Sequence, residues 1–177
     1  MALVAARSQF LRRKVVEAQR DAPPGEKLRV CLPEVDENAF NLLLEFIYTD
    51  KIDPTAGDRS MAGSDIVVRS MMEVYALAIS FQMERLEVLC LQYLESNVNL
   101  NNVLAAFTIA SQMALHSFKE FCLKFIIKDC IYNQVVMSPE FESLEKPLLL
   151  EVVRSHTRSR TSCRHGLSDE LAPQAQV

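Results

Sequence analysis

The sequence predicts an α+β fold that is predominantly α-helical, on three observations. Apolar residues recur at intervals of three and four along most of the 177-residue chain, which is the spacing of amphipathic helices. Only four glycines are present, which favours helices over a β-sandwich. A single segment, 27–32, alternates apolar with polar residues and indicates one short, half-buried strand.

The first helix is expected over residues 8–20, where Ser8 is a suitable N-cap and apolar residues follow at helical spacing. The basic residues of this segment are expected to form a solvated face. The run Pro23-Pro24-Gly25 then breaks the chain before the strand at 27–32.

A second helix is expected to begin after Asp36, whose side chain can cap it, and to run through Ile47. Residues 50–63 contain Pro54 and two glycines among polar residues, so this segment is expected to be a loop.

From residue 64 onward, the pattern predicts helices joined by short connections. The expected segments are 64–80, capped by Ser64 or Asp65, then 84–96, a helix that begins with the apolar residues at 100–107, 115–128, 133–137, a new start at Ser138-Pro139, and 147–153. Stacked antiparallel helix pairs of this kind usually present surfaces for partner proteins. Residues 155–177 lack periodic apolar positions and are expected to form a disordered tail.

The composition excludes several classes of function. A net charge of −4 and an isoelectric point near 5.4 argue against nucleic-acid binding. No run approaches the roughly 18 to 20 apolar residues that a membrane-spanning helix needs. The five cysteines form no C-x-x-C pair, so neither a disulfide framework nor a zinc site, and hence no cofactor, is predicted.

No constellation for catalysis is found either. The chain has no Gly-rich phosphate loop and no nucleophile elbow. His116 is the one histidine in a segment expected to fold, and a capping or surface role is favoured for it over general-base chemistry. His156, Cys163 and His165 match no common zinc spacing. A protein-interaction module is therefore favoured over a helical enzyme with an unrecognised site.

Three stretches of the chain resemble the BTB/POZ fold. They are ALVAARSQF (2–10), the stretch ending in FIYTDKI (30–52), and the stretch containing MERLEVLC (71–96). Residues 1–97 are thereby identified as an incomplete BTB/POZ domain, whose first helix and first strands would precede Ala2. Residues 98–154 are similar to the BACK-type helical extension, and the finer resemblance is to the leucine-zipper-like regulator group, which combines kelch repeats with BTB-BACK modules.

This resemblance implies a substrate adaptor of cullin-3 ubiquitin ligases. The family's hydrophobic-x-Glu docking motif would correspond to Met71, Met72 and Glu73, although Met71 in the core is an equally supported interpretation. Tyr48, Asp50 and Ile52 would form the neighbouring part of the docking surface.

The resemblance also bears on the alternative function, the assembly, the substrates and the location of the protein. A BTB scaffold for corepressor binding or cytoskeletal assembly is the alternative function. Homodimers or heterodimers of BTB domains are expected to be weakened by the missing first helix. The resembled group is associated with Ras-family substrates, but no residue of this sequence identifies a substrate. A cytoplasmic location is expected, with peripheral endomembrane association or a nuclear location as alternatives.

Overall fold

The computed structural model describes residues 6–21, 28–30, 32, 35–55 and 64–165, with the side chains of Asp21 and of residues 161–165 left out. In these ranges all regular secondary structure is helical. The helices are α2 (Gln9–Asp21), α3 (Glu37–Thr49), α4 (Asp65–Ser80), α5 (Glu84–Asn97), α6 (Val103–Gln112), α7 (His116–Ile126), α8 (Asp129–Val136), α9 (Pro139–Glu142) and α10 (Lys146–His165).

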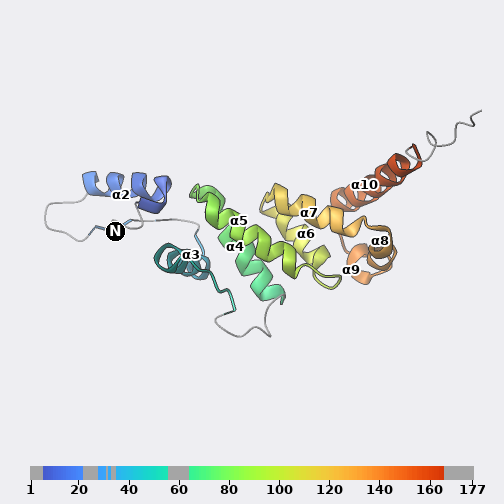
Figure 1. Cartoon of the computed structure of the whole chain (residues 1–177), viewed down its shortest axis with the longest axis horizontal. Helices are drawn as coiled ribbons and strands as arrows, with labels where there is room; N and C mark the ends of the chain where they lie inside the picture. The colour runs from blue at the N-terminus through green and yellow to red at the C-terminus, as the bar shows by residue number, and fades with distance from the viewer. Residues whose placement is uncertain (1–5, 22–27, 31, 33–34, 56–63, 166–177) are drawn as a thin grey trace, which may run out of the picture.

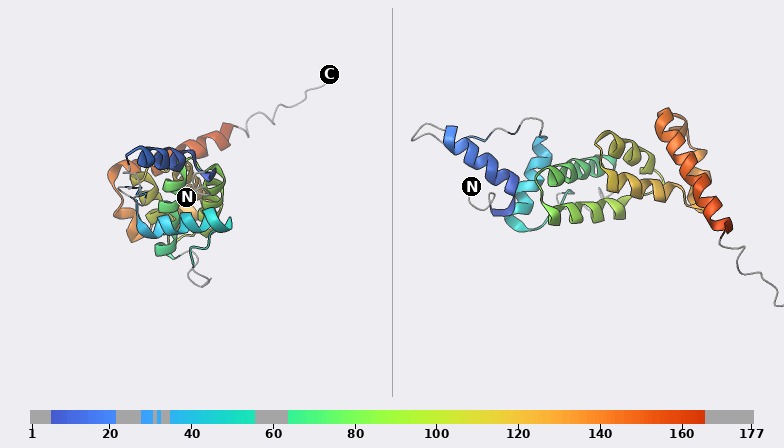
Figure 2. Two further views of the ribbon diagram at one scale, coloured as in Figure 1. Left: turned by 90° about the vertical axis from the view of Figure 1, so that its left-hand side faces the viewer. Right: turned by 90° about the horizontal axis from the view of Figure 1, so that it is seen from above.

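The helices form an elongated stack. Helices α2 and α3 lie at one end, the hairpins α4–α5 and α6–α7 follow, and α8, α9 and α10 lie at the other end (Figures 1 and 2). The closest packing is within the α4–α5 and α6–α7 hairpins, and α4 also packs against α3 and α6. The predicted stack of antiparallel helix pairs is therefore confirmed after residue 64.

One continuous apolar core runs through the stack. Its largest fully buried side chains include Phe107 and Phe118, which join α6 to α7, and Leu43 and Ile47, which seat α3 on the next layer. Removing these side chains from water stabilises the fold by roughly 2 to 3 kcal/mol each.

Three of the predicted helix caps are confirmed. The Asp36 side chain accepts a hydrogen bond from the Ala39 N–H at 2.9 Å, and Ser64 accepts one at its own helix start at 3.4 Å. Ser8 accepts from the Leu11 N–H at 3.2 Å, and its hydroxyl donates to the Phe81 carbonyl at 2.8 Å. Ser8 is almost fully buried, so this cap also fixes α2 to the turn between α4 and α5.

The predicted strand at 27–32 is not found in the described residues, and the α+β class is not confirmed. Residues 28–30 and 32 have no regular secondary structure, while 27 and 31 lie outside the described residues. A strand is stabilised by pairing its backbone N–H and C=O groups with a neighbouring strand. The described part of the chain supplies no such neighbour, so alternation alone was insufficient.

The predicted end of the last helix is wrong. Helix α10 continues to His165, so residues 155–165 are helical where a disordered tail was expected. Leu148, Val152 and His156 lie four residues apart on one buried face, and the His156 ring stacks on Tyr132 with centroids 3.5 Å apart. A count of apolar residues misses this contact, because the anchoring side chain is a histidine. Residues 166–177 lie outside the described residues.

Candidate partner-binding surface

The structure places the two methionines of the predicted docking motif in the core. Met71 and Met72 on α4 are both 0% exposed and belong to the continuous core. Helix α4 packs against α3, α5 and α6, so adjacent positions on it face different neighbours and both become buried. The core interpretation of Met71 is therefore supported, and neither methionine can touch a partner in this conformation.

Glu73, the third residue of that motif, lies nearer the surface. Its side chain is 31% exposed, and its Oε1 lies 3.7 Å from Nε of Arg69 on the same helix. An ion pair of this kind between adjacent turns contributes only about 0.3 to 0.5 kcal/mol. Glu73 is thus accessible to a partner and only loosely held by its own helix.

The end of α3 carries the other predicted residues. Tyr48 is 63% exposed, although Phe46 and Ile47 immediately before it are buried. Asp50 ends the helix in the left-handed conformation (φ 60°, ψ 18°), and its N–H donates to the Phe46 carbonyl at 2.8 Å. Aspartate tolerates this conformation better than most residues, because its short polar side chain can bond locally. Ile52 is half-buried and packs against the core.

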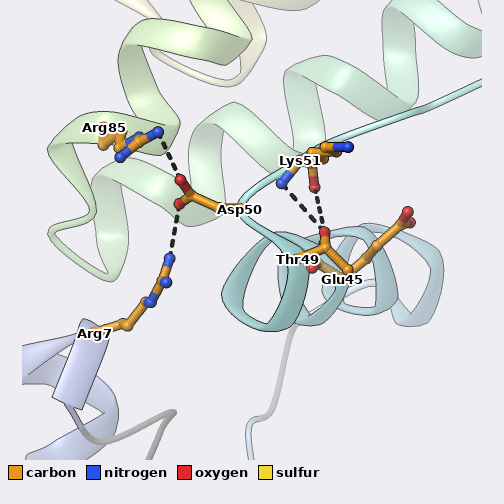
Figure 3. Close-up of polar contacts among 6 residues, drawn as sticks. All are labelled: Arg7, Glu45, Thr49, Asp50, Lys51 and Arg85. Atoms are coloured by element: carbon orange, nitrogen blue, oxygen red, sulfur yellow. Dashed lines mark hydrogen bonds and ion pairs between the residues drawn. The ribbon is translucent and has the colours of Figure 1, made fainter.

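The Asp50 carboxylate joins three segments of the chain, as Figure 3 shows. Oδ1 accepts a hydrogen bond from Nη1 of Arg7 at 2.8 Å, and Oδ2 lies 2.6 Å from Nη2 of Arg85 at the start of α5. These three residues are called the Asp50 junction below. All three side chains are at least one third exposed, so the ion pairs orient the segments more than they stabilise them.

Local hydrogen bonds hold the backbone on either side of Asp50. The Thr49 hydroxyl donates to the Glu45 carbonyl at 2.7 Å and accepts from the Lys51 N–H at 3.2 Å (Figure 3). The Asp53 carboxylate accepts a hydrogen bond from the backbone N–H of Thr55 at 3.0 Å. These bonds together fix the backbone that follows α3. Tyr48 is consequently presented from a fixed backbone.

A shallow groove of about 330 Å³ lies beside the Asp50 junction. Phe46, Met83 and Leu86 contribute apolar atoms to it, and Arg7 and Arg85 stand among its lining residues. A small recess lined by both apolar and charged groups can receive a single side chain of a partner protein.

No local pattern in the sequence identified the two arginines of the junction. Arg7 lies 43 positions before Asp50, and Arg85 precedes Leu86 on a different helix. Charges that meet across such separations are brought together only by packing of the helices. A pattern of charges within one helix could not have identified them.

The described residues also bear on whether the protein has a metal site, a membrane-spanning helix or a reactive thiol. No cluster of three or more His, Cys, Asp or Glu in the described ranges could hold a metal ion. Within the same ranges, no helix has the length and apolarity that crossing a membrane requires. Cys90 and Cys122 are buried, and burial raises the pKa of each thiol to about 12, so they remain protonated near neutral pH. Cys130 is exposed.

Comparison with known proteins gives a consistent family. The BTB/POZ domain model matches residues 2–98. The leucine-zipper-like transcriptional regulator 1 of mouse is 41% identical over 87% of this chain, the human protein 40% over 87%, and the fruit-fly homologue 35% over 87%. The chain spans about a fifth of the length of these relatives, covering 20%, 20% and 18% of them respectively. Because its family model covers more than half of the chain, this protein belongs to the BTB/POZ family of protein-interaction domains.

Proposed function

We propose that this chain is the cullin-binding module of a substrate adaptor for a cullin-3 ubiquitin ligase, and that the cullin contacts the end of α3. In this proposal residues 1–97 form the BTB unit and residues 98–154 form its BACK-like helical extension. The observation that carries the proposal is the exposed Tyr48, held on a fixed backbone beside the Asp50 junction.

Tyrosine suits the centre of a protein interface. Its ring supplies a large apolar area with little loss of conformational freedom, and its hydroxyl can bond to a partner. At 63% exposure, the Tyr48 ring leaves most of its area available for a partner, while the rest of its turn is anchored in the core. The charged groups of Asp50 and Arg85 would form a polar rim, which steers association more than it adds affinity.

The proposed contact residues are therefore fewer than the sequence suggested. Tyr48 is the central contact, Asp50 belongs to the rim, and Ile52 supports the surface from its half-buried position. Glu73 remains an accessible candidate at 31% exposure. Met71 and Met72 would act only through the stability of α4.

The test measures binding of the full chain to the N-terminal domain of cullin-3 by biolayer interferometry. Tyr48→Ala is expected to weaken binding at least tenfold, as truncation of an interface hot spot costs roughly 2 kcal/mol or more. Ile66→Ala is the matched control, because Ile66 is a large apolar residue that is 72% exposed on another helix. Both variants should unfold at the wild-type urea concentration.

Met71→Ala provides a second control. It should lower the free energy of unfolding by roughly 2 to 5 kcal/mol, because it leaves a cavity, without changing the affinity of the folded protein. Wild-type affinity in Tyr48→Ala would refute the proposed surface. Absence of binding by the wild-type chain would refute the cullin-3 role and leave the scaffold alternative.

A further inference from the structure

We infer that a groove between α6, α8 and α9 is a second docking site, which receives an amphipathic helix with basic residues from a partner protein. The helices that line this acidic groove lie on the side of the molecule away from α3 (Figure 1), so the inference goes beyond the proposed cullin contact. The volume of this recess is about 900 Å³.

The floor of the acidic groove is apolar. Leu104 of α6 and Val135 of α8 are nearly fully buried, and the half-buried Ile109 and Leu144 continue the lining on either side. The principal partner of α6 is α7, and α8 packs against α7 and α9, so the groove lies where residues of α6, α8 and α9 line one recess. An amphipathic helix of a partner protein commonly binds with its apolar face in an apolar groove between two helices.

An exposed apolar side chain lines the acidic groove, and another adjoins the lining in sequence. Leu100 lines it and is 43% exposed, and Met137, which precedes the lining residue Ser138, is 86% exposed. A flexible methionine adapts to an incoming apolar surface. An exposed large apolar residue on the lining of a groove adds contact area for a partner.

The charge of the lining selects the occupant. Glu140 and Glu145 are the charged residues among those that line the acidic groove, and both are exposed. Among the described residues that line it, none is a lysine, arginine or histidine. Two carboxylates repel the phosphates of nucleic acids and of anionic lipids, and they attract lysine and arginine side chains. A partner helix with an apolar stripe flanked by basic residues therefore satisfies both the floor and the rim.

The direct test titrates the full, isotope-labelled chain with one synthetic peptide and follows backbone amide shifts. The probe is a capped 14-residue peptide, which is about four helical turns long. It has leucines at positions 2, 6, 9 and 13 and lysines at the positions beside them. Its control carries glutamate in place of every lysine. The lysine peptide is expected to bind with shifts confined to α6, α8 and α9, and at least tenfold more tightly than the glutamate peptide.

Two protein variants locate the contact. Glu140→Lys should weaken binding of the lysine peptide at least fivefold. Glu142→Lys changes the net charge equally, on the same short helix, at an exposed residue that does not line the acidic groove, and should weaken binding less than twofold. Ala105→Phe places a ring in the groove from an exposed position and should also weaken binding at least fivefold.

Three results would each overturn the inference: no shifts with the lysine peptide up to millimolar concentration, equal binding of the glutamate peptide, or equal effects of Glu140→Lys and Glu142→Lys. Binding of cullin-3 to Glu140→Lys separates this site from the proposed function. Unchanged cullin-3 affinity supports a separate partner, whereas its loss would assign the acidic groove to the cullin and refute a second site. Failure of the Tyr48 test leaves the peptide result unaffected.

Discussion

The Asp50 junction combines two ion pairs with a left-handed helix cap, and substitutions at Asp50 can separate the two contributions. Asp50→Asn keeps a residue that tolerates φ 60° but removes the charge. Asp50→Gly removes the charge and also the steric cost of the left-handed conformation. Asp50→Ala removes the charge and leaves a side chain that strongly disfavours this conformation.

The expected magnitudes follow from the geometry. Because the side chains of the two pairs are at least one third exposed, each pair contributes about 0.2 to 1 kcal/mol, so both together contribute about 1 kcal/mol. The left-handed conformation costs an alanine about 1 to 2 kcal/mol relative to glycine. Asn should therefore destabilise by about 1 kcal/mol, Ala by about 2 to 3 kcal/mol, and Gly by at most about 1 kcal/mol, because relief of the backbone offsets part of the loss.

Urea unfolding followed by far-ultraviolet circular dichroism measures these differences. Repeating it in about 1 M salt, where the screening length falls to about 3 Å, should shrink the loss in Asp50→Asn and leave the difference between Ala and Gly unchanged. If Asp50→Ala is as stable as Asp50→Gly, the cap does not impose the left-handed conformation. If Asp50→Asn equals the wild type in low salt, the ion pairs contribute nothing.

Three further predictions concern serine caps and cysteine thiols. Ser8→Ala should lower the free energy of unfolding by about 2 kcal/mol, because it removes both an N-cap and a buried hydroxyl that donates a hydrogen bond. Ser64→Ala removes an N-cap alone and should lower it by about 1 kcal/mol. Equal losses of the two variants in urea unfolding would contradict this. In the native protein at pH 8, a thiol reagent should modify Cys130 rapidly and Cys90 and Cys122 only on unfolding. Burial raises the pKa of these two thiols from 9.0 to about 12 in the folded protein, so the thiols of the unfolded chain lose their protons at lower pH. The free energy of unfolding should therefore fall as the pH rises from about 9 toward 12. A urea midpoint that stays constant over this range would argue against this.

Much of the local structure was predictable from the sequence, because caps and amphipathic spacing act within a few residues. Asp36 and Ser64 were identified as caps from residue type and position, and both form the expected bonds. The FIYTDKI segment indicated the family, which the match to residues 2–98 confirms. Each of these signals is contained in one helix or one short motif.

The candidate site was only partly predictable. Tyr48 and Asp50 lie at the surface as expected, but Met71 and Met72 do not. A hydrophobic-x-Glu motif specifies residue types, but it does not specify how many other helices pack around the helix that carries it. Helix α4 is covered by three other helices, and this arrangement buries side chains that an isolated amphipathic helix would expose.

The sequence by itself determined most of the helix starts after residue 64, although α8 begins at Asp129 and not near the expected Asn133. It also determined which family the chain joins, since both depend on interactions between residues close together along it. Only the tertiary structure decided that residues 28–30 and 32 lack regular secondary structure, that residues 155–165 are helical, that Asp50 pairs with Arg7 and Arg85, and that the acidic groove forms. Each of these depends on partners far away in the chain. A contact between distant residues forms only when the intervening helices pack, so no local pattern of residues encodes it.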